Sequence, residues 1–259
     1  MGNRKKRREQ FFQKHPNCCF CGGMEFATTE DHQPARTFFR NRAWPEGFVF
    51  PACEACNETT KRSEQVMSLL ANGNSENVDR QAYQALIRSL KSEYPDIVRQ
   101  MLPNSSNEIR GILRQGGLQK PHGIAYGELP LVKLNRDFWD FHIEQFSRKL
   151  LIAFHYMCFG KPLSETGGAF AWFHTNFDWA AGRFPNEILE LAERVAVPSR
   201  QKAFLGDQFG VRWNSLDEPR SAVFVAHIHA SMIISGITTE CPTDFKSSKS
   251  ERLLRPWKW

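Results

Sequence analysis

The chain has 259 residues, of which 41% are hydrophobic, 12% aromatic and 24% charged. This composition is typical of a folded globular protein and excludes wholesale disorder, a collagen-like repeat and a coiled-coil rod. No apolar run reaches the roughly 18 residues of a membrane-spanning helix, and the first residues lack the apolar stretch of a secretion signal. We therefore expect a cytoplasmic protein with no membrane contact.

The positive charge is concentrated at the beginning of the chain. The net charge is +6, and residues 1–15 contain only one acid, Glu9, beside six basic residues. These are Arg4, Lys5, Lys6, Arg7, Arg8 and Lys14. A basic cluster of this kind is the usual footprint of a polyanion-binding surface, although a solvated tail has the same composition.

The first quarter of the chain predicts a small unit rich in cysteine. Residues 4–14 predict a basic helix, which ends at His15-Pro16-Asn17. Strands are expected at residues 26–31 and 48–50, followed by a helix at 54–70. The polar stretch at residues 71–77 then predicts a domain boundary near residue 74, so that residues 1–74 form one unit and residues 75–259 another.

The second unit predicts a larger mixture of helices and antiparallel strands. Apolar residues recur at helical spacing over residues 79–102 and 138–159. Strands are expected at 169–175 and 222–237, with a hairpin loop at 214–219. The predicted fold class of the whole chain is therefore α+β. No catalytic motif is found in residues 75–259, which leaves self-association, binding of a protein partner or positioning of a target as open roles.

Four of the seven cysteines have the spacing of metal ligands. Cys18 and Cys21 form one Cys-x-x-Cys pair, Cys53 and Cys56 form a second, and 31 residues separate the pairs. Two such pairs complete a tetrahedral sulfur site that suits Zn²⁺, and a site with all four positions filled is structural. Reduced buried thiols are the alternative, and the neighbouring Cys19 competes with Cys18 as a ligand.

The residues around the two cysteine pairs carry a family resemblance. Thr28-Thr29-Glu30-Asp31-His32-Gln33-Pro34 lies between the pairs, and Asn57 directly follows Cys56. Over residues 11–65 this order resembles the HNH endonucleases, also called the ββα-metal or His-Me finger family. The resemblance implies a zinc-stapled ββα-metal finger that hydrolyses DNA phosphodiester bonds. In this reading His32 is the general base, and Asp31 and Asn57 hold a catalytic Mg²⁺ or Mn²⁺. The family's middle asparagine has no match, because Trp44-Pro45-Glu46-Gly47 stands in its place.

The chemistry of these residue types agrees with that implication. A neutral imidazole can deprotonate a water molecule, and a hard cation held by oxygen ligands can neutralise charge on a phosphate. Four basic residues are expected to contact phosphates, with a solvated basic face as the alternative. They are Arg36, Arg40, Lys61 and Arg62.

The sequence therefore predicts a metal-dependent HNH endonuclease that acts on DNA, with RNA left open as a substrate. The alternative is a zinc-dependent nucleic-acid-binding protein without catalysis, and a third class is an interaction protein that uses residues 75–259. His227 and His229 face one side of a predicted strand, where they are either a metal pair or part of a half-buried sheet face.

Overall fold

The structure is a computed structural model that describes residues 2–73, 80–120, 122–126, 129, 131–133, 135–196, 199–200, 203–244 and 253–258. Helices and an antiparallel sheet are both present, so the predicted α+β class is confirmed. Within these ranges no helix combines the length and the apolar character that crossing a bilayer requires. We call residues 2–73 the N-terminal unit and the described residues from Arg80 onward the body.

The N-terminal unit consists of one basic helix, one β-hairpin and two short helices. Its elements are α1 (Gly2–Lys14), β1 (Thr29–His32), β2 (Val49–Ala52), α2 (Glu54–Thr59) and α3 (Lys61–Gly73). The strands β1 and β2 are antiparallel, and Thr29 lies opposite Ala52 in the register. The loop between them contains two 3-10 turns, η1 (Arg36–Phe38) and η2 (Arg40–Arg42).

The body begins with helices and ends with a sheet. Its helices are α4 (Arg80–Glu93), α5 (Pro95–Met101), α6 (Ser106–Gln115), α7 (Arg136–Phe159), α8 (Asn176–Ala180) and α9 (Asn186–Leu191), and a 3-10 turn η4 (Pro242–Asp244) follows the last strand. Asn135 caps the start of α7 by accepting a hydrogen bond from the Phe138 amide. At the other end Gly160 adopts the left-handed conformation that commonly ends a helix.

Five antiparallel strands of the body form one sheet in the order β3-β9-β8-β7-β4. Their bounds are β3 (Gly168–Thr175), β4 (Arg194–Ala196), β7 (Phe209–Leu216), β8 (Ser221–Ile228) and β9 (Met232–Thr239). A separate small hairpin contains β5 (Ser199–Arg200) and β6 (Ala203–Phe204). One face of the sheet packs on α7, and α9 covers part of the other face, as the alternating burial of β8 requires.

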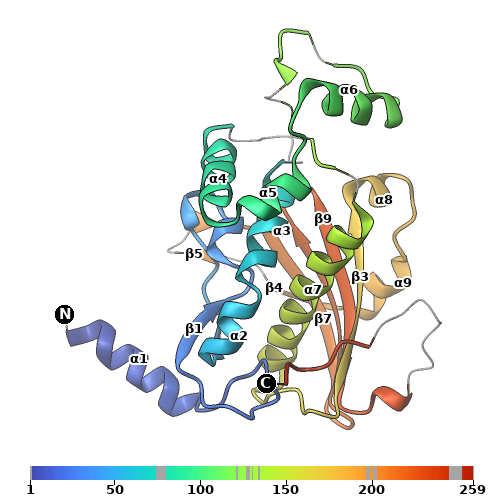
Figure 1. Ribbon diagram of the computed structural model, residues 1–259. Coiled ribbons are helices and arrows are strands. Elements are labelled where there is room, and N and C mark those ends of the chain that lie inside the picture. Colours follow the sequence, from blue (N-terminus) through green and yellow to red (C-terminus); the bar gives the residue numbers. More distant parts are fainter. Residues whose placement is uncertain are drawn as a thin grey trace.

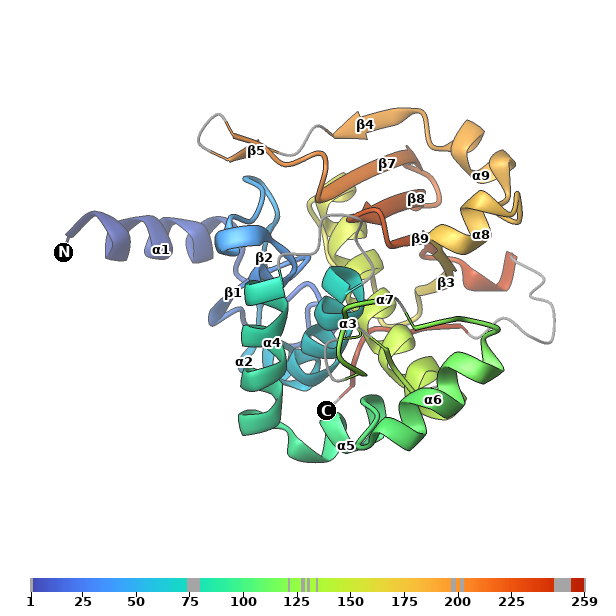
Figure 2. The same cartoon turned by 90° about the horizontal axis from the view of Figure 1, so that it is seen from above.

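The long helix α7 lies at the centre of the molecule. Figures 1 and 2 show α7 between the sheet on one side and α3 of the N-terminal unit on the other. In the same views α1 extends away from the rest of the protein. The N-terminal unit is therefore packed on the body through α3 and the loop after β1, whereas most of α1 lies in solvent.

The N-terminal unit and the body share one hydrophobic core. Phe38 and Phe48 of the β1–β2 loop belong to the same buried cluster as Phe146 and Phe154 of α7 and Phe209 of β7. The rings of Phe38 and Phe146 stack with their centroids 4.9 Å apart. The two predicted units therefore contribute to one buried cluster, and the predicted boundary near residue 74 lies outside the described residues.

Several predicted elements are divided in the structure. The helix expected at 79–102 is broken at Tyr94-Pro95, because proline cannot continue the hydrogen bonding of the preceding turn. The helix expected at 54–70 is interrupted at Thr60. The apolar stretch 222–237 forms two strands, since the chain turns at residues 229–231. The predicted hairpin at 214–219 is present, although β7 continues as far as Leu216.

The shared core predicts that the protein unfolds in one cooperative transition. We expect Phe38→Ala to lower the free energy of unfolding by about 3–5 kcal/mol, because it removes a fully buried ring. The exposed residue Leu118 offers a control, for which Leu118→Ala should change the free energy by less than about 0.5 kcal/mol. Calorimetry measures both variants, and two separate transitions in the wild type would contradict a shared core.

Candidate metal centre and nucleic-acid interface

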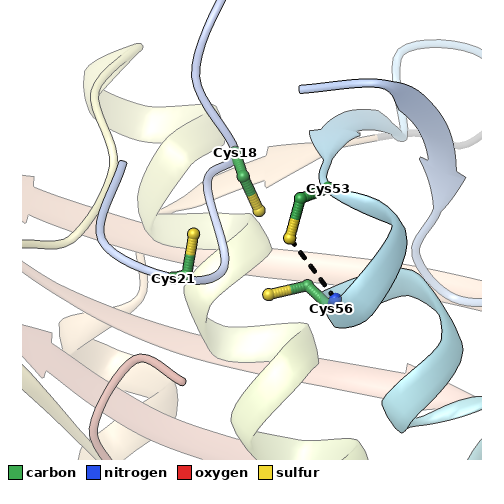
Figure 3. Close-up of side chains that lie close together, drawn as sticks. All are labelled: Cys18, Cys21, Cys53 and Cys56. Atoms are coloured by element: carbon green, nitrogen blue, oxygen red, sulfur yellow. Dashed lines mark hydrogen bonds between the residues drawn. The ribbon is translucent and has the colours of Figure 1, made fainter. Parts of the chain in front are cut away.

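The four predicted cysteine ligands come together in the N-terminal unit. The sulfur atoms of Cys18, Cys21, Cys53 and Cys56 all lie within 4.8 Å of one another, and all four residues are buried. Figure 3 shows the four thiol groups directed toward a common point. Zn–S bonds of about 2.3 Å in a tetrahedron place sulfurs roughly 3.8 Å apart, so the cluster fits a metal ion such as zinc with little movement.

Each cysteine pair lies in a tight turn that its own sequence produces. After Cys21 the chain reverses at Gly22 and Gly23, whose φ values of +71° and +81° favour glycine. Cys53 caps the start of α2, and its sulfur accepts a hydrogen bond from the Cys56 amide at 3.4 Å (Figure 3). These two turns bring the four sulfurs together, and the body packs against them, since the Trp257 amide donates to the Phe20 carbonyl.

The thiol groups influence one another strongly. A hydrogen bond with Cys21 raises the pKa of Cys18 to about 12, and the same contact lowers the pKa of Cys21 to about 2. A bound divalent cation would stabilise the deprotonated form of both thiols. Cys19 is also buried but faces Asp31 and Lys149, and burial raises the pKa of its thiol, so it is not a fifth member of the cluster.

Asp31, a predicted ligand of the catalytic metal, lies in a buried ionic cluster. One of its oxygens, Oδ2, is 2.6 Å from Nζ of Lys149 on α7, and the same Nζ is 2.8 Å from Oε1 of Glu64 on α3. Nε2 of Gln33 donates to Oδ1 of Asp31 and to Oε1 of Glu64. The side chain of Lys149 has no exposed surface, and Asp31 is 5% exposed. An ammonium group thus occupies the position beside Asp31 that a metal cation would require.

The charges in this cluster do not balance. Two carboxylates surround one ammonium, and burial raises the pKa of Asp31 to about 6, with Glu64 acting in the same direction. Burial disfavours the charged form of Lys149, but the two carboxylates more than compensate and raise its pKa well above the ordinary range. Lys149 therefore stays protonated, and Asp31 is the group that takes up a proton in mildly acidic solution.

His32, the predicted general base, lies at the end of β1 on the face opposite Asp31. Its ring nitrogen Nε2 is 2.8 Å from a guanidinium nitrogen of Arg36, and its ring meets the indole of Trp44 edge-on. The Arg36 guanidinium in turn lies 3.6 Å from the centroid of a Trp44 ring. Because arginine only donates, Nε2 of His32 accepts this hydrogen bond and the ring proton is on Nδ1.

Asn57 lies near the other end of β1. Its Nδ2 donates to Oγ1 of Thr29 at 3.1 Å, and Thr29 shares a strand face with Asp31. The structure thus places Asp31 and Asn57 on one side of the hairpin and His32 on the other. Across the described ranges, the cysteine cluster is the one group of three or more Cys, His, Asp or Glu side chains close enough to share an ion.

The predicted phosphate-contacting residues form ion pairs or stacked contacts within the protein. Arg40 pairs with Asp207, Lys61 with Glu58 and Arg62 with Asp96. Arg62 also lies over the ring of Tyr94, and Arg36 stacks on Trp44 as described. These side chains are partly exposed, and a phosphate would compete with their acidic partners for each of them.

The remaining histidine candidates are bound to protein groups. Nε2 of His227 lies 3.0 Å from the Gly206 carbonyl, and Nε2 of His229 lies 2.5 Å from the Phe38 carbonyl. His15, three residues before Cys18, hydrogen-bonds the Tyr156 hydroxyl at 2.7 Å. His227 lies on the exposed face of β8, whereas His229 is buried in the turn that follows this strand, so the two histidines do not share a strand face.

Sequence reasoning missed Lys149, Glu64 and Trp44. A signal for Lys149 was present, since it lies three residues after Phe146 and one before Leu150, on the apolar stripe of a helix. A lysine in that stripe needs a buried acidic partner. Trp44 lies in the segment that replaces the family's middle asparagine, where the resemblance gave no expectation.

Comparison of the chain with protein-family models, with curated proteins and with solved structures finds no match.

The cysteine cluster predicts one tightly bound metal ion per chain, zinc by the preference of four thiolates. We expect Cys53→Ser to lose this ion and much of the folded structure, because one of the two turns loses its anchor. Cys241→Ser serves as the control, since Cys241 is exposed and outside the cluster. Elemental analysis and circular dichroism measure the outcome. A fully metallated and folded Cys53→Ser protein would show that the four sulfurs are not the ligands.

The ionic cluster predicts that Lys149→Met is destabilising by about 3–5 kcal/mol at pH 8, because it leaves buried carboxylates without a counter-charge. The penalty should shrink as the pH falls toward 5. Burial raises the pKa of Asp31 in the folded protein, so this carboxyl group stabilises the folded state more at low pH than at high pH. In the variant, protonation of Asp31 at low pH removes a buried unpaired charge, and the cost of the substitution falls.

Urea unfolding at pH 5 and pH 8 measures this effect, with the exposed Lys161→Met as the control. Equal stability of Lys149→Met and wild type at pH 8 would show that the cluster contributes nothing to the fold.

Proposed function

We propose that this protein binds nucleic acid and that a structural zinc ion holds its N-terminal unit in shape. The observation that carries the proposal is the basic helix α1, which extends away from the rest of the chain (Figure 1). The side chains of Lys5, Lys6, Arg7 and Arg8 on this helix are all exposed. A surface of this charge and shape fits a polyanion.

The energetics of α1 support an anionic partner. A helix of 13 residues is marginal in water on its own, and like charges on neighbouring turns weaken it further. The Arg8 guanidinium of this helix donates to the Thr28 carbonyl at 2.8 Å. Phosphates along the helix would replace the repulsion between lysines and arginines with attraction, and the release of counterions would favour binding.

The zinc ion has a structural role in this proposal. All four ligand positions are thiolates, which leaves no position for a reacting water molecule. Its contribution is to fix the residues that follow α1, because the first ligand, Cys18, comes shortly after Lys14, the last residue of the helix. The direction of the basic helix therefore depends on the metal.

Catalysis by a second metal finds less support in the contacts. Magnesium or manganese at Asp31 and Asn57 would require Lys149 to leave Asp31, and removal of a buried ammonium from two carboxylates is costly. His32 would also have to release Arg36 before it could accept a proton at Nε2. Binding without divalent-metal catalysis is therefore the function we propose first.

The HNH endonuclease remains the second candidate, and one observation favours it. A β-hairpin followed by a helix carries His32 at the partly exposed end of β1, beside Arg36, which can contact a phosphate. In that case His32 would deprotonate the attacking water molecule, and Asp31 and Asn57 would hold the cation after a rearrangement of Lys149.

We expect the triple variant Lys5→Gln, Lys6→Gln, Arg7→Gln to bind labelled DNA and RNA more weakly than wild type. The slope of log Kd against log salt concentration should fall by about 2, since each lost phosphate contact removes about 0.7–0.9. The control removes the same charge from exposed positions elsewhere, as Lys91→Gln, Arg114→Gln, Arg136→Gln. Fluorescence anisotropy measures both variants, and equal salt slopes for the two would contradict a role of α1.

The same samples separate the two candidate functions. We expect wild type to leave plasmid DNA intact in Mg²⁺ or Mn²⁺ while it still binds DNA. Cutting that EDTA or His32→Ala abolishes would instead establish the endonuclease.

A further inference from the structure

An exposed aromatic residue lies at the base of the basic helix. Phe26 is 75% exposed, the highest value among the exposed large hydrophobic residues of the described chain, and Met24 beside it is 42% exposed. Both lie in the segment between Cys21 and β1. The chain thus presents an apolar surface in water next to its most basic element.

The backbone that carries Phe26 is held firmly from both sides. Phe26 forms a β-bridge with Asn17, the Cys18 amide donates to the Glu25 carbonyl, and the Ala27 amide donates to the Pro16 carbonyl, both at 2.8 Å. The turn at Gly22 and Gly23 and the cysteine cluster close the other end of the loop. The backbone of Phe26 is therefore held in place, and the position of its exposed ring changes mainly by rotation about the side-chain bonds.

The helix α1 is fastened to the same segment. The Arg8 guanidinium binds the Thr28 carbonyl two residues after Phe26, and the same guanidinium lies 5.5 Å from the ring of Phe12. The end of α1 leads through His15 and Pro16 directly to Asn17, which is the bridge partner of Phe26. The exposed ring of Phe26 therefore lies in the segment to which the basic helix is attached through Arg8.

Proteins that bind single-stranded nucleic acid combine basic and aromatic side chains. Basic side chains follow the phosphates, and aromatic rings stack on the bases, whichever base is present. A fully paired duplex keeps its bases stacked on each other and offers no base face to a fixed ring. A purely electrostatic surface would not need an exposed phenylalanine, and an acidic protein partner would not need a stacking platform.

We propose that Phe26 is a stacking platform for an unpaired base, with the phosphates of the same strand lying along α1. The inference rests on the proposed function and narrows it to single-stranded or unpaired nucleic acid. A stacking contact does not distinguish ribose from deoxyribose, so the test uses both DNA and RNA strands. Glu25 and Glu9 are the acids nearest in sequence to this surface, and both repel phosphate.

The test uses the full zinc-loaded chain with fluorescein-labelled oligonucleotides of 15 nucleotides, as single-stranded DNA, single-stranded RNA and duplex DNA. We expect Phe26→Ala to weaken binding of single strands about ten-fold, as loss of one stacked base predicts. Duplex binding and the salt slope should change less than two-fold, because no phosphate contact is removed. Phe26→Trp should retain single-strand binding. Phe141→Ala, which removes an exposed ring from α7, is the matched control and should behave as wild type.

The outcomes distinguish the stacking platform from nucleic-acid binding itself. Unchanged single-strand binding by Phe26→Ala, with loss of binding when Lys5, Lys6 and Arg7 are replaced, would overturn the stacking platform and leave nucleic-acid binding intact. Absence of binding by wild type to every oligonucleotide would overturn both. If wild type without nucleic acid sediments as a dimer and Phe26→Ala as a monomer, the exposed ring is a contact between two copies of the chain and the platform is also overturned.

Discussion

The contact between the Lys149 ammonium and the carboxylates of Asp31 and Glu64 governs the N-terminal half of the structure. It joins β1, α3 and α7 at a point without solvent, where an unpaired charge would be costly. The same contact fixes the hairpin on the long helix and occupies the carboxylate that a metal-dependent nuclease would use. Asp31 can either pair with Lys149, which stabilises the fold, or hold a metal cation, and in this structure it pairs with Lys149.

The cysteine cluster and the ionic cluster stabilise the hairpin in different ways. The four cysteines organise the local turns, because their sulfurs come from two Cys-x-x-Cys segments within the N-terminal unit. Lys149 and the aromatic core attach that unit to the body. A metal ion alone would shape the hairpin without orienting it, and the ionic cluster alone would not form the turns. Both are needed to present α1 and Phe26 in a fixed relation.

Local patterns in the sequence predicted the metal cluster and most of the elements around it. Cysteine spacing is a short-range signal, as are the basic composition of α1 and the apolar periodicity of α7. The partner of Asp31 was not predictable in this way, since Lys149 lies 118 positions later and a tertiary contact brings the two together. The shared core was not predicted for the same reason, because Phe38 and Phe209 each look like ordinary apolar residues in their own segments. The strands β1 and β2 and the helix α2 lie close to where the local sequence pattern predicts two strands and a helix, but that pattern carried no information about what faces them.

The turn between β8 and β9 illustrates how closely the two parts are interlocked. His229 reaches the Phe38 carbonyl, and the hydroxyl of Ser231 donates to the Ala71 carbonyl at 2.7 Å. Backbone groups of the N-terminal unit thus complete the end of a strand pair that is distant in the chain. Grafting residues 2–73 onto a different scaffold would leave those carbonyls and the rings of Phe38 and Phe48 in water, so the unit is not portable in the manner of an independent zinc finger.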